Sequence, residues 1–271
     1  MFSPRGDGSP PRTRPVDEAL YRLHAEREES YWWWVAKNRI ILDLIRRYMP
    51  SRDGIGAPRA LDIGCGSGGV LAKLVAPPLN FQAIGIDMSP IAREYCARRD
   101  LTALDGSLPD ALPPSLAPGT FDVIIMSEVI EHVDQDRPAI ETVIKLLRPG
   151  GVLVCTVPAH TWLWSSHDDF NFHKRRYTRS QFGALFEGLG FERIVLSYYQ
   201  TAALPLVLAG RSWEKLRTRL TGVSPVAPRV RPLPGPANWL LTKAFEIEKY
   251  LLPRVRMPWG TSVISVHRKE K

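Results

Sequence analysis

The chain has 271 residues, of which 44% are hydrophobic and 24% charged, which is the composition of a folded globular protein and excludes wholesale disorder. No apolar run approaches the ~20 residues that span a bilayer, and residues 1–15 contain no apolar segment of the kind that a signal peptide needs. The three cysteines show neither metal-ligand spacing nor the even number of a disulfide framework, so we expect free thiols in a reducing, cytoplasmic setting.

The predicted elements begin with a tail and a helix. Residues 1–16 are rich in Pro, Gly and Arg and are predicted to be disordered. The pattern over 16–49 is helical, with apolar residues that recur at spacings of three and four between Tyr31 and Ile45, and Pro50 ends the run. This helix carries the aromatic run Tyr31-Trp32-Trp33-Trp34, whose side chains either pack the helix onto the domain or roof an apolar ligand pocket.

From residue 51 onward, short apolar segments alternate with helical ones. The predicted strands are 59–63, 81–86, 121–126, 152–157, 191–199 and 262–267. Strands that alternate with helices favour a mainly parallel sheet with helices on both faces, which is the α/β class. The predicted divisions are a tail (1–16), a helical cap (17–50), a core (51–199), an insertion (200–260) and a final strand with its tail (261–271).

The insertion at 200–260 concentrates the positive charge of the chain. Between Gln200 and Arg256 there are ten basic and three acidic residues, which accounts for nearly all of the net charge of +8. An apolar patch over 202–209 precedes a basic stretch over 211–219, and Pro205 is expected to break a helix there. This combination predicts either a lid over a ligand pocket or contact with an anionic membrane surface. A solvated, partly disordered insertion is the third interpretation.

The segment LDIGCGSGG (61–69) joins the first strand to a helix through a glycine-rich turn. Glycines let the backbone turn sharply and approach a ligand closely, although the pattern alone also fits a dinucleotide-binding turn. Asp87 ends the second strand, where a carboxylate can accept hydrogen bonds from two ribose hydroxyls. Asp105 follows later and could accept a hydrogen bond from an adenine amino group. These features predict a cofactor that contains a nucleoside.

Four motifs in this order resemble the class I S-adenosylmethionine-dependent methyltransferases: LDIGCGSGG (61–69), IGIDMSP (84–90), FDVIIMSEVIEHV (121–133) and LLRPGGVLV (146–154). The resemblance covers about half of the chain. It implies a Rossmann-like sheet of seven strands, the last one antiparallel and inserted beside the sixth. The aromatic helix and the segment His173-Lys174-Arg175-Arg176-Tyr177-Thr178 resemble, more particularly, the bacterial type-11/type-12 methyltransferase group.

The resemblance implies S-adenosyl-L-methionine as the cofactor and a set of residues that bind it. That set comprises Asp62, Gly64, Cys65 and Gly66 at the methionine part, Asp87 with the adjacent Met88 at the ribose, Asp105, Gly106 and Ser107 at the adenine, and Ser127 at the end of the fourth strand. Substrates of the group are diverse, so the resemblance defines the cofactor better than the methyl acceptor.

Methyl transfer to a hydroxyl group requires that the hydroxyl lose its proton, ideally to a side chain with a pKa near the working pH. The segment after the fifth strand contains His173, which we predict to be the base, and His167 as the alternative. Asp168 or Asp169 would orient the imidazole, and the neighbouring arginines would lower the pKa of His173 if they lay close. No metal site is expected, because the His and Asp spacings match no standard ligand pattern.

We therefore expect methyl transfer to a hydroxyl group of a small-molecule, glycan or lipid-linked acceptor. The enzyme would be cytoplasmic, and peripheral at the inner membrane face if the insertion binds lipid. N- or C-methylation of a natural product is the alternative, since it needs the same cofactor pocket. A nucleic-acid partner is not expected, because the chain has no Asn-Pro-Pro-Tyr-like motif after the fourth strand and no recognisable RNA-binding module. The sequence leaves the oligomeric state undetermined.

Overall fold

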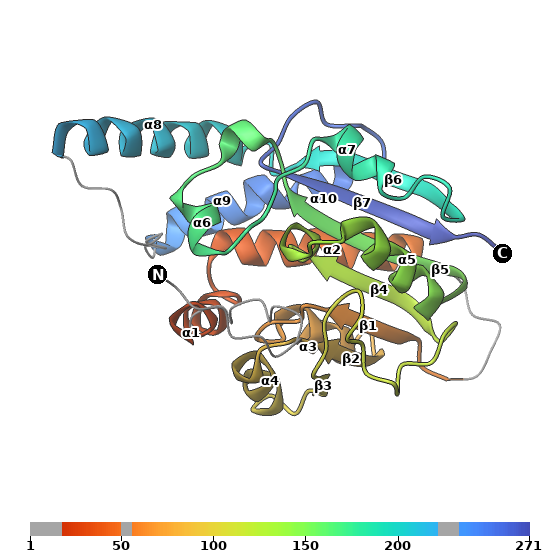
Figure 1. Cartoon of the computed structure of the whole chain (residues 1–271). Coiled ribbons are helices and arrows are strands. Elements are labelled where there is room, and N and C mark those ends of the chain that lie inside the picture. The colour runs from red at the N-terminus through yellow and green to blue at the C-terminus, as the bar shows by residue number, and fades with distance from the viewer. Residues whose placement is uncertain (1–17, 50–55, 222–232) are drawn as a thin grey trace, which may run out of the picture.

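The computed structural model of the chain describes residues 18–49, 56–221 and 233–271, which form a seven-stranded sheet with surrounding helices (Figure 1). The strands are β1 (Arg59–Ile63), β2 (Gln82–Ile86), β3 (Ala103–Leu104), β4 (Phe121–Ser127), β5 (Leu147–Pro158), β6 (Phe191–Tyr199) and β7 (Ser262–Lys269). Their order is β3-β2-β1-β4-β5-β7-β6, and β7 runs antiparallel between β5 and β6, whereas the other neighbours are parallel. The predicted Rossmann-like α/β fold is confirmed.

Periodicity did not predict β3, although the family resemblance implied a seventh strand. β3 has only two residues, Ala103 and Leu104, which pair with Gly85 and Ile86 of β2. An alternation of apolar and polar residues cannot be recognised over two positions. The pairing with β2 defines this strand.

Helices cover both faces of the sheet, as expected. Those within the core are α3 (Gly69–Val75), α4 (Pro90–Ala97), α5 (Asp136–Leu146), α6 (Ser166–Phe170) and α7 (Arg179–Ala184), with short 3₁₀ turns at η1 (Ile130–His132) and η2 (Thr161–Leu163). Two local caps are present as the sequence indicates. The Ser89 hydroxyl accepts a hydrogen bond from Ala92 N in α4, and Thr178 and Gln181 form a capping box at the start of α7.

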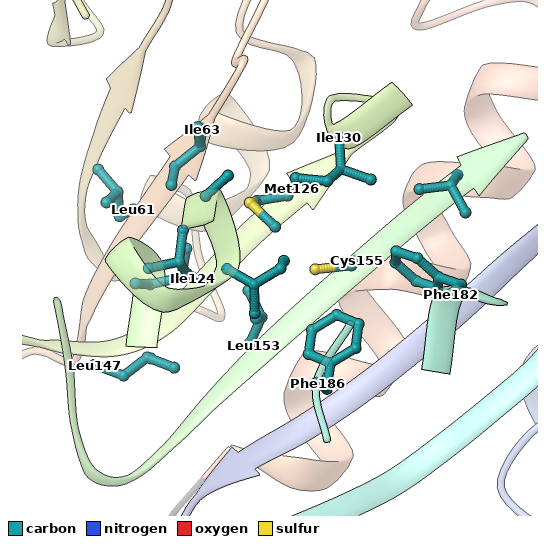
Figure 2. Close-up of a cluster of buried hydrophobic side chains, with 14 of the residues drawn as sticks. Leu61, Ile63, Ile124, Met126, Ile130, Leu147, Leu153, Cys155, Phe182 and Phe186 are labelled. Carbon is teal, nitrogen blue, oxygen red and sulfur yellow. The ribbon is translucent and has the colours of Figure 1, made fainter. Parts of the chain in front are cut away.

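The sheet separates two apolar layers because successive side chains of a strand point to opposite faces. In β4, Ile124 and Met126 pack in one layer with α5 and α7, and Val123 and Ile125 pack in the other with α2 and α3. Figure 2 shows the first layer, to which α7 contributes Phe182. These layers hold the strands rigidly, so the loops at their carboxyl ends start from well-defined positions.

The predicted helical segment consists of two helices, α1 (Glu18–Arg27) and α2 (Trp32–Tyr48), with a break at residues 28–31. Long-range contacts hold the break between them. The Glu28 carboxylate accepts a hydrogen bond from the Ser67 hydroxyl at 2.9 Å. Trp32 N donates to Oδ1 of Asn238, which lies 206 positions away in α9 (Gly235–Glu246) and so caps α2. No local pattern could reveal these partners.

The insertion contains α8 (Ala203–Thr221), α9 and α10 (Glu248–Leu251). The expectation that Pro205 breaks a helix is wrong. Pro205 is the third residue of α8, and the first turn of a helix tolerates proline because its N–H groups have no acceptor within the helix. The Glu248 carboxylate accepts hydrogen bonds from Gln200 N and Thr201 N, and thus anchors the chain just before α8.

Within the described ranges, none of the helices combines the length and the apolarity needed to cross a bilayer. α1 and α2 fall in the predicted cap, and α8 to α10 fall in the predicted insertion. The predicted tail over 1–16 lies outside the described residues. The division of the chain into cap, core, insertion and final strand stays a prediction.

Candidate active site

The glycine-rich turn after β1 forms one wall of the candidate site. Gly64, Gly66 and Gly68 have φ angles of 69°, 54° and 85°, a left-handed backbone that favours glycine. A Cβ added at Gly64 would lie 2.5 Å from a methyl carbon of Val129, whereas one added at Gly66 would meet nothing within 4 Å. Gly64 thus allows close packing, and the backbone at Gly66 borders space that a ligand can fill.

Asp87 follows β2 directly and faces this turn. Its Oδ2 accepts a hydrogen bond from Gly66 N, and its Oδ1 accepts one from Ser89 N, both at 2.9 Å. The Tyr21 hydroxyl of α1 donates to the same Oδ1 at 3.4 Å. Burial raises the pKa of Asp87, and the two backbone hydrogen bonds oppose that shift. A carboxylate has about four acceptor positions, so Asp87 retains capacity for a ligand hydroxyl.

The predicted adenine residues follow β3. Asp105 is exposed, and its Oδ1 lies 2.8 Å from Nη1 of Arg93. The same Nη1 donates to the Asp87 carbonyl at 2.7 Å, which connects Asp105 to the Asp87 side of the site. Gly106 and Ser107 continue into a tight turn that backbone hydrogen bonds of Ser107 close. Their role in adenine binding stays a prediction.

Three other predicted cofactor residues have different surroundings. Cys65 is buried in the glycine turn with its Sγ 3.9 Å from Sγ of Cys96, and both are free thiols, as expected. Met88 is 42% exposed beside Asp87, so it can cover a ligand at the rim. The Ser127 hydroxyl at the end of β4 lies 3.2 Å from the hydroxyl of Thr156 on β5.

A buried charge cluster lies between the glycine turn and the segment after β5. Asp62 of β1, Glu128 after β4, Glu131 of η1 and Lys37 of α2 interact electrostatically there. Burial raises the pKa of Asp62 to about 7, and Lys37 opposes that shift. Burial and the charge of Glu128 raise the pKa of Glu131 well above its ordinary value, while burial lowers that of Lys37. Within the described residues, neither carboxylate oxygen of Glu131 has a hydrogen-bond partner.

His173 is held by Asp168. The imidazole Nδ1 lies 2.9 Å from Asp168 Oδ1, and Arg176 Nε donates to the same oxygen at 2.6 Å. Ser165 N donates to the other oxygen of Asp168 at 2.9 Å. The second imidazole nitrogen, Nε2, lies 4.0 Å from Oε1 of Glu131. The structure therefore joins the predicted base, through Glu131, to the charge cluster beside the glycine turn.

The two candidate histidines and the two candidate carboxylates have different surroundings. Asp168 contacts His173, whereas Asp169 accepts a hydrogen bond from Trp164 Nε1. The ring centroid of His167 lies 6.4 Å from that of His173. Burial, with a smaller contribution from the charge of His173, lowers the pKa of His167 to about 4.

The two arginines next to His173 are engaged by carboxylates. Arg175 Nη1 lies 2.9 Å from Oδ2 of Asp136, and Arg176 binds Asp168. Their positive charges are thus compensated by acidic neighbours.

Glu131, His132 and His173 form a group that could hold a divalent cation, because one ligand atom from each lies within 4.8 Å of the others. Burial, followed by the charge of His173, lowers the pKa of His132 to about 4, so this imidazole is neutral as a metal ligand must be. Residue spacing did not suggest this group, since His132 and His173 come from segments 41 positions apart in the chain. The expectation of no metal stays a prediction.

Sequence reasoning missed Tyr21, Glu28, Lys37 and Glu131. Lys37 had a recognisable signal, because it shares one helix face with the buried residues Ile40, Ile41 and Leu44 of α2, which follow it at spacings of three, four and seven. A lysine on a buried helix face is rarely there without a partner. The other three gave no local signal, since their partners come from other elements.

Comparison with known proteins identifies the family. Residues 31–196, well over half of the chain, match the family described as "Methyltransferase domain", and the chain belongs to it. The mitochondrial ubiquinone biosynthesis O-methyltransferase of Schizosaccharomyces pombe is 30% identical over 150 residues, which are 51% of this chain and 54% of that protein. The chain thus spans about half the length of the curated relatives that it matches.

Two solved structures are similar in fold. Haemonchus contortus phosphoethanolamine N-methyltransferase 2 in complex with S-adenosyl-L-methionine has a TM-score of 0.55 and 16% identity, covering 93% of this chain and 60% of that one. An S-adenosylmethionine-dependent methyltransferase from Archaeoglobus fulgidus has a TM-score of 0.51 and 17% identity, covering 85% and 94%. These likenesses show the fold. With the family match, they confirm the predicted class and S-adenosylmethionine as the cofactor of the domain.

The residues present fit this cofactor. Its methionine part carries an ammonium and a carboxylate group, and the site offers Asp62 for the first and Lys37 for the second. The unpaired oxygens of Glu131 follow β4 and the open space beside Gly66 follows β1, so both come after the carboxyl ends of two neighbouring parallel strands.

Proposed function

We propose that the protein transfers a methyl group from S-adenosylmethionine to a hydroxyl oxygen of a small-molecule, glycan or lipid-linked acceptor, with His173 as the base. The contact between His173 Nδ1 and Asp168 carries this proposal. When Nδ1–H donates a hydrogen bond to a carboxylate, the imidazole proton stays on Nδ1. The lone pair of Nε2 is then available to take a proton. The name of the Schizosaccharomyces pombe relative, an O-methyltransferase, supports a hydroxyl acceptor.

In this proposal charged side chains hold the cofactor both at its ribose and at its methionine part. Asp87 accepts hydrogen bonds from the ribose hydroxyls, in addition to those from Gly66 N and Ser89 N. Asp62 and Lys37 bind the two charged groups of the methionine part, and the segment 105–107 borders the adenine. When bound, S-adenosylmethionine supplies an electrophilic methyl group. The side chains then have to hold the acceptor in line with it, which is a large part of catalysis for a displacement reaction.

His173 would take the proton that the acceptor hydroxyl loses as its oxygen forms the new bond to carbon. Burial alone would raise the pKa of Asp168, but hydrogen bonds from His173 and Arg176 outweigh burial and hold the pKa well below its usual range. Asp168 therefore stays ionised and stabilises the imidazolium that forms. Glu131 faces Nε2 from 4.0 Å and, because its pKa is raised, it is available as an uncharged hydrogen-bonding group for the acceptor.

Single-turnover kinetics test the role of His173. The acceptor is first identified by mass spectrometry of polar and lipid extracts after incubation with isotopically labelled cofactor. His173→Ala should then slow methyl transfer by roughly 10²–10⁴-fold, the range for a positioned base, and leave the affinity for S-adenosylhomocysteine intact. A loss below about tenfold would reject His173 as the base. If His167→Ala slowed methyl transfer strongly and His173→Ala did not, His167 would be the base.

The same labelling experiment separates the hydroxyl acceptor from the alternative. A product methylated on nitrogen or carbon would replace the proposal with N- or C-methylation.

We further propose that the protein acts in the cytoplasm without a nucleic-acid partner. The acceptor would be reached at the inner membrane face where it is lipid-linked. Fractionation of cells that express the tagged full chain tests this location.

A further inference from the structure

Large apolar side chains are exposed mainly in one part of the molecule. Within the described residues, thirteen of the seventeen exposed large apolar side chains lie between Leu206 and Trp259. They include Trp213, Trp239 and Trp259, each more than half exposed. Scattered apolar residues are normal on a protein surface, but a concentration of this kind marks an interaction site.

α8 arranges five of its exposed residues in one line. Leu206, Ala209, Trp213, Leu216 and Leu220 are spaced by three, four, three and four positions, and all are exposed. Residues at these spacings share one face of a helix. We call this set the apolar stripe. It runs along most of α8, a helix of 19 residues that is about 28 Å long at 1.5 Å per residue.

The opposite side of α8 attaches the helix to the body of the protein. Ala203 is buried and packs in a cluster with Phe245 of α9, and Val207 joins that cluster. Figure 1 shows that the rest of α8 extends beyond the other elements of the fold. The apolar stripe therefore points away from the core, and none of the described elements covers it.

Positive charge surrounds this surface. Arg217 and Arg219 are exposed on α8, and Arg254 and Arg256 are exposed in the segment that leads to Trp259. The Thr201 hydroxyl donates to the Trp259 carbonyl at 2.9 Å, so this segment is joined to the start of α8.

Two acidic residues of the insertion have described side chains, and neither offsets these arginines. Glu248 is buried, and Glu246 pairs with Arg39, Lys243 and Lys249. Exposed tryptophan and leucine beside exposed arginine are the composition of a helix that lies in the interface of an anionic bilayer.

We propose that α8, with the segment around Trp259, docks the protein onto an anionic membrane, with the apolar stripe in the headgroup region. Charge favours this occupant over a second copy of the chain, because pairing two stripes would bring the arginines of both copies together. The start of α8 also reaches the active site. Gln200, just before α8, accepts a hydrogen bond from Trp33 Nε1 of α2, the helix that carries Lys37.

Docking would therefore bring Trp33 and the start of α2 close to the membrane surface, where a lipid-linked acceptor is found. This last step rests on the proposed function, whereas the docking itself does not. Lid closure over the site is the competing interpretation of the insertion. A lid would not need an outward apolar face.

Flotation of the full chain with lipid vesicles tests the docking. The protein should bind phosphatidylcholine vesicles that contain phosphatidylglycerol, bind pure phosphatidylcholine vesicles weakly, and be released by added salt. The triple variant Trp213→Ser, Leu216→Ser, Leu220→Ser should partition at least about tenfold less well, because it removes most of the apolar stripe. Unchanged thermal unfolding and S-adenosylhomocysteine binding would show that the variant is folded.

Charge variants give an independent readout. Arg217→Gln with Arg219→Gln should weaken binding to the anionic vesicles by roughly fivefold for each arginine. Val75→Ser on α3 and Arg98→Gln directly after α4 are controls on another part of the surface that should bind like the natural chain. Equal binding to both vesicle types, or none at low salt, would overturn the proposal. So would a dimer in sedimentation velocity that the triple variant abolishes. No acceptor is present, so a failure of the proposed O-methylation would leave these results unaffected.

Discussion

The Nδ1 atom of His173 lies 2.9 Å from Oδ1 of Asp168, and Arg176 donates to the same oxygen. One buried carboxylate thus orients the imidazole and is itself held by a guanidinium group. A segment without a long helix or strand would ordinarily move too much to position a base. Here the three side chains form a connected unit at the carboxyl edge of the sheet, which supplies the rigidity that the backbone lacks.

Asp168→Asn should slow the single-turnover rate by at least about tenfold, because an amide cannot stabilise the imidazolium as a carboxylate does. The affinity for S-adenosylhomocysteine, measured by calorimetry, should remain unchanged. Asp169→Asn is the matched control on the same helix, since Asp169 contacts Trp164 rather than His173. Equal losses in the two variants would mean that Asp168 does not act through His173.

Asp87→Asn should weaken S-adenosylhomocysteine binding by roughly tenfold or more, because the ribose hydroxyls lose a charged acceptor. The single oxygen of asparagine can accept from one of the two backbone N–H groups that Asp87 now binds on separate oxygens, so thermal unfolding of the variant is measured as a control for the turn. Titration calorimetry measures the change. Asp105→Asn, at an exposed position, should have a much smaller effect, and the reverse order of the two losses would contradict the assignment.

Lys37→Met should weaken S-adenosylhomocysteine binding by about tenfold, since a buried cation that pairs with the methionine carboxylate is lost. Binding of methylthioadenosine, which lacks the amino-acid group, should be nearly unchanged. This comparison isolates the methionine part of the ligand. Arg39→Met in the same helix is the control, because Arg39 is exposed and pairs with Glu246. Equal weakening of both ligands would argue that Lys37 serves the fold alone.

His267 predicts acid sensitivity. It is buried in β7, its ring stacks on Phe186 at 3.8 Å, and burial lowers its pKa to about 3. Below pH 6.5 the unfolded chain protonates this histidine, whereas the folded chain does not. His267 therefore does not reduce the free energy of unfolding above about pH 6.5. As the pH decreases from there toward 3, His267 lowers the free energy of unfolding by up to about 1.4 kcal/mol per pH unit.

Urea unfolding between neutral and acidic pH measures this slope. His24, His132 and His167 also have lowered pKa values, so the total slope should exceed that of one group. His267→Leu should make the slope shallower by up to the contribution of one proton. An identical slope in the variant would show that His267 does not titrate differently in the two states.

Local patterns were sufficient for most strands of the sheet, β3 excepted, and for the wall of the cofactor site. Short apolar segments predicted β4 and β6 almost to the residue, and the glycines at 64, 66 and 68 predicted a turn that the left-handed φ angles confirm. The Ser89 cap follows from the same kind of information. Each of these depends on residues close together in the chain, whose sterics and hydrogen bonding the sequence alone determines.

Tertiary structure decided what the sequence left open. The choice of Asp168 over Asp169, the burial of Lys37 among acids and the cap that Asn238 places on α2 all depend on partners brought together from distant elements. So does the exposure of the apolar stripe, because an amphipathic helix shows which face is apolar but not whether another element covers it. A side chain's neighbours along the chain are determined by sequence, whereas its neighbours in space exist only after the layers have packed.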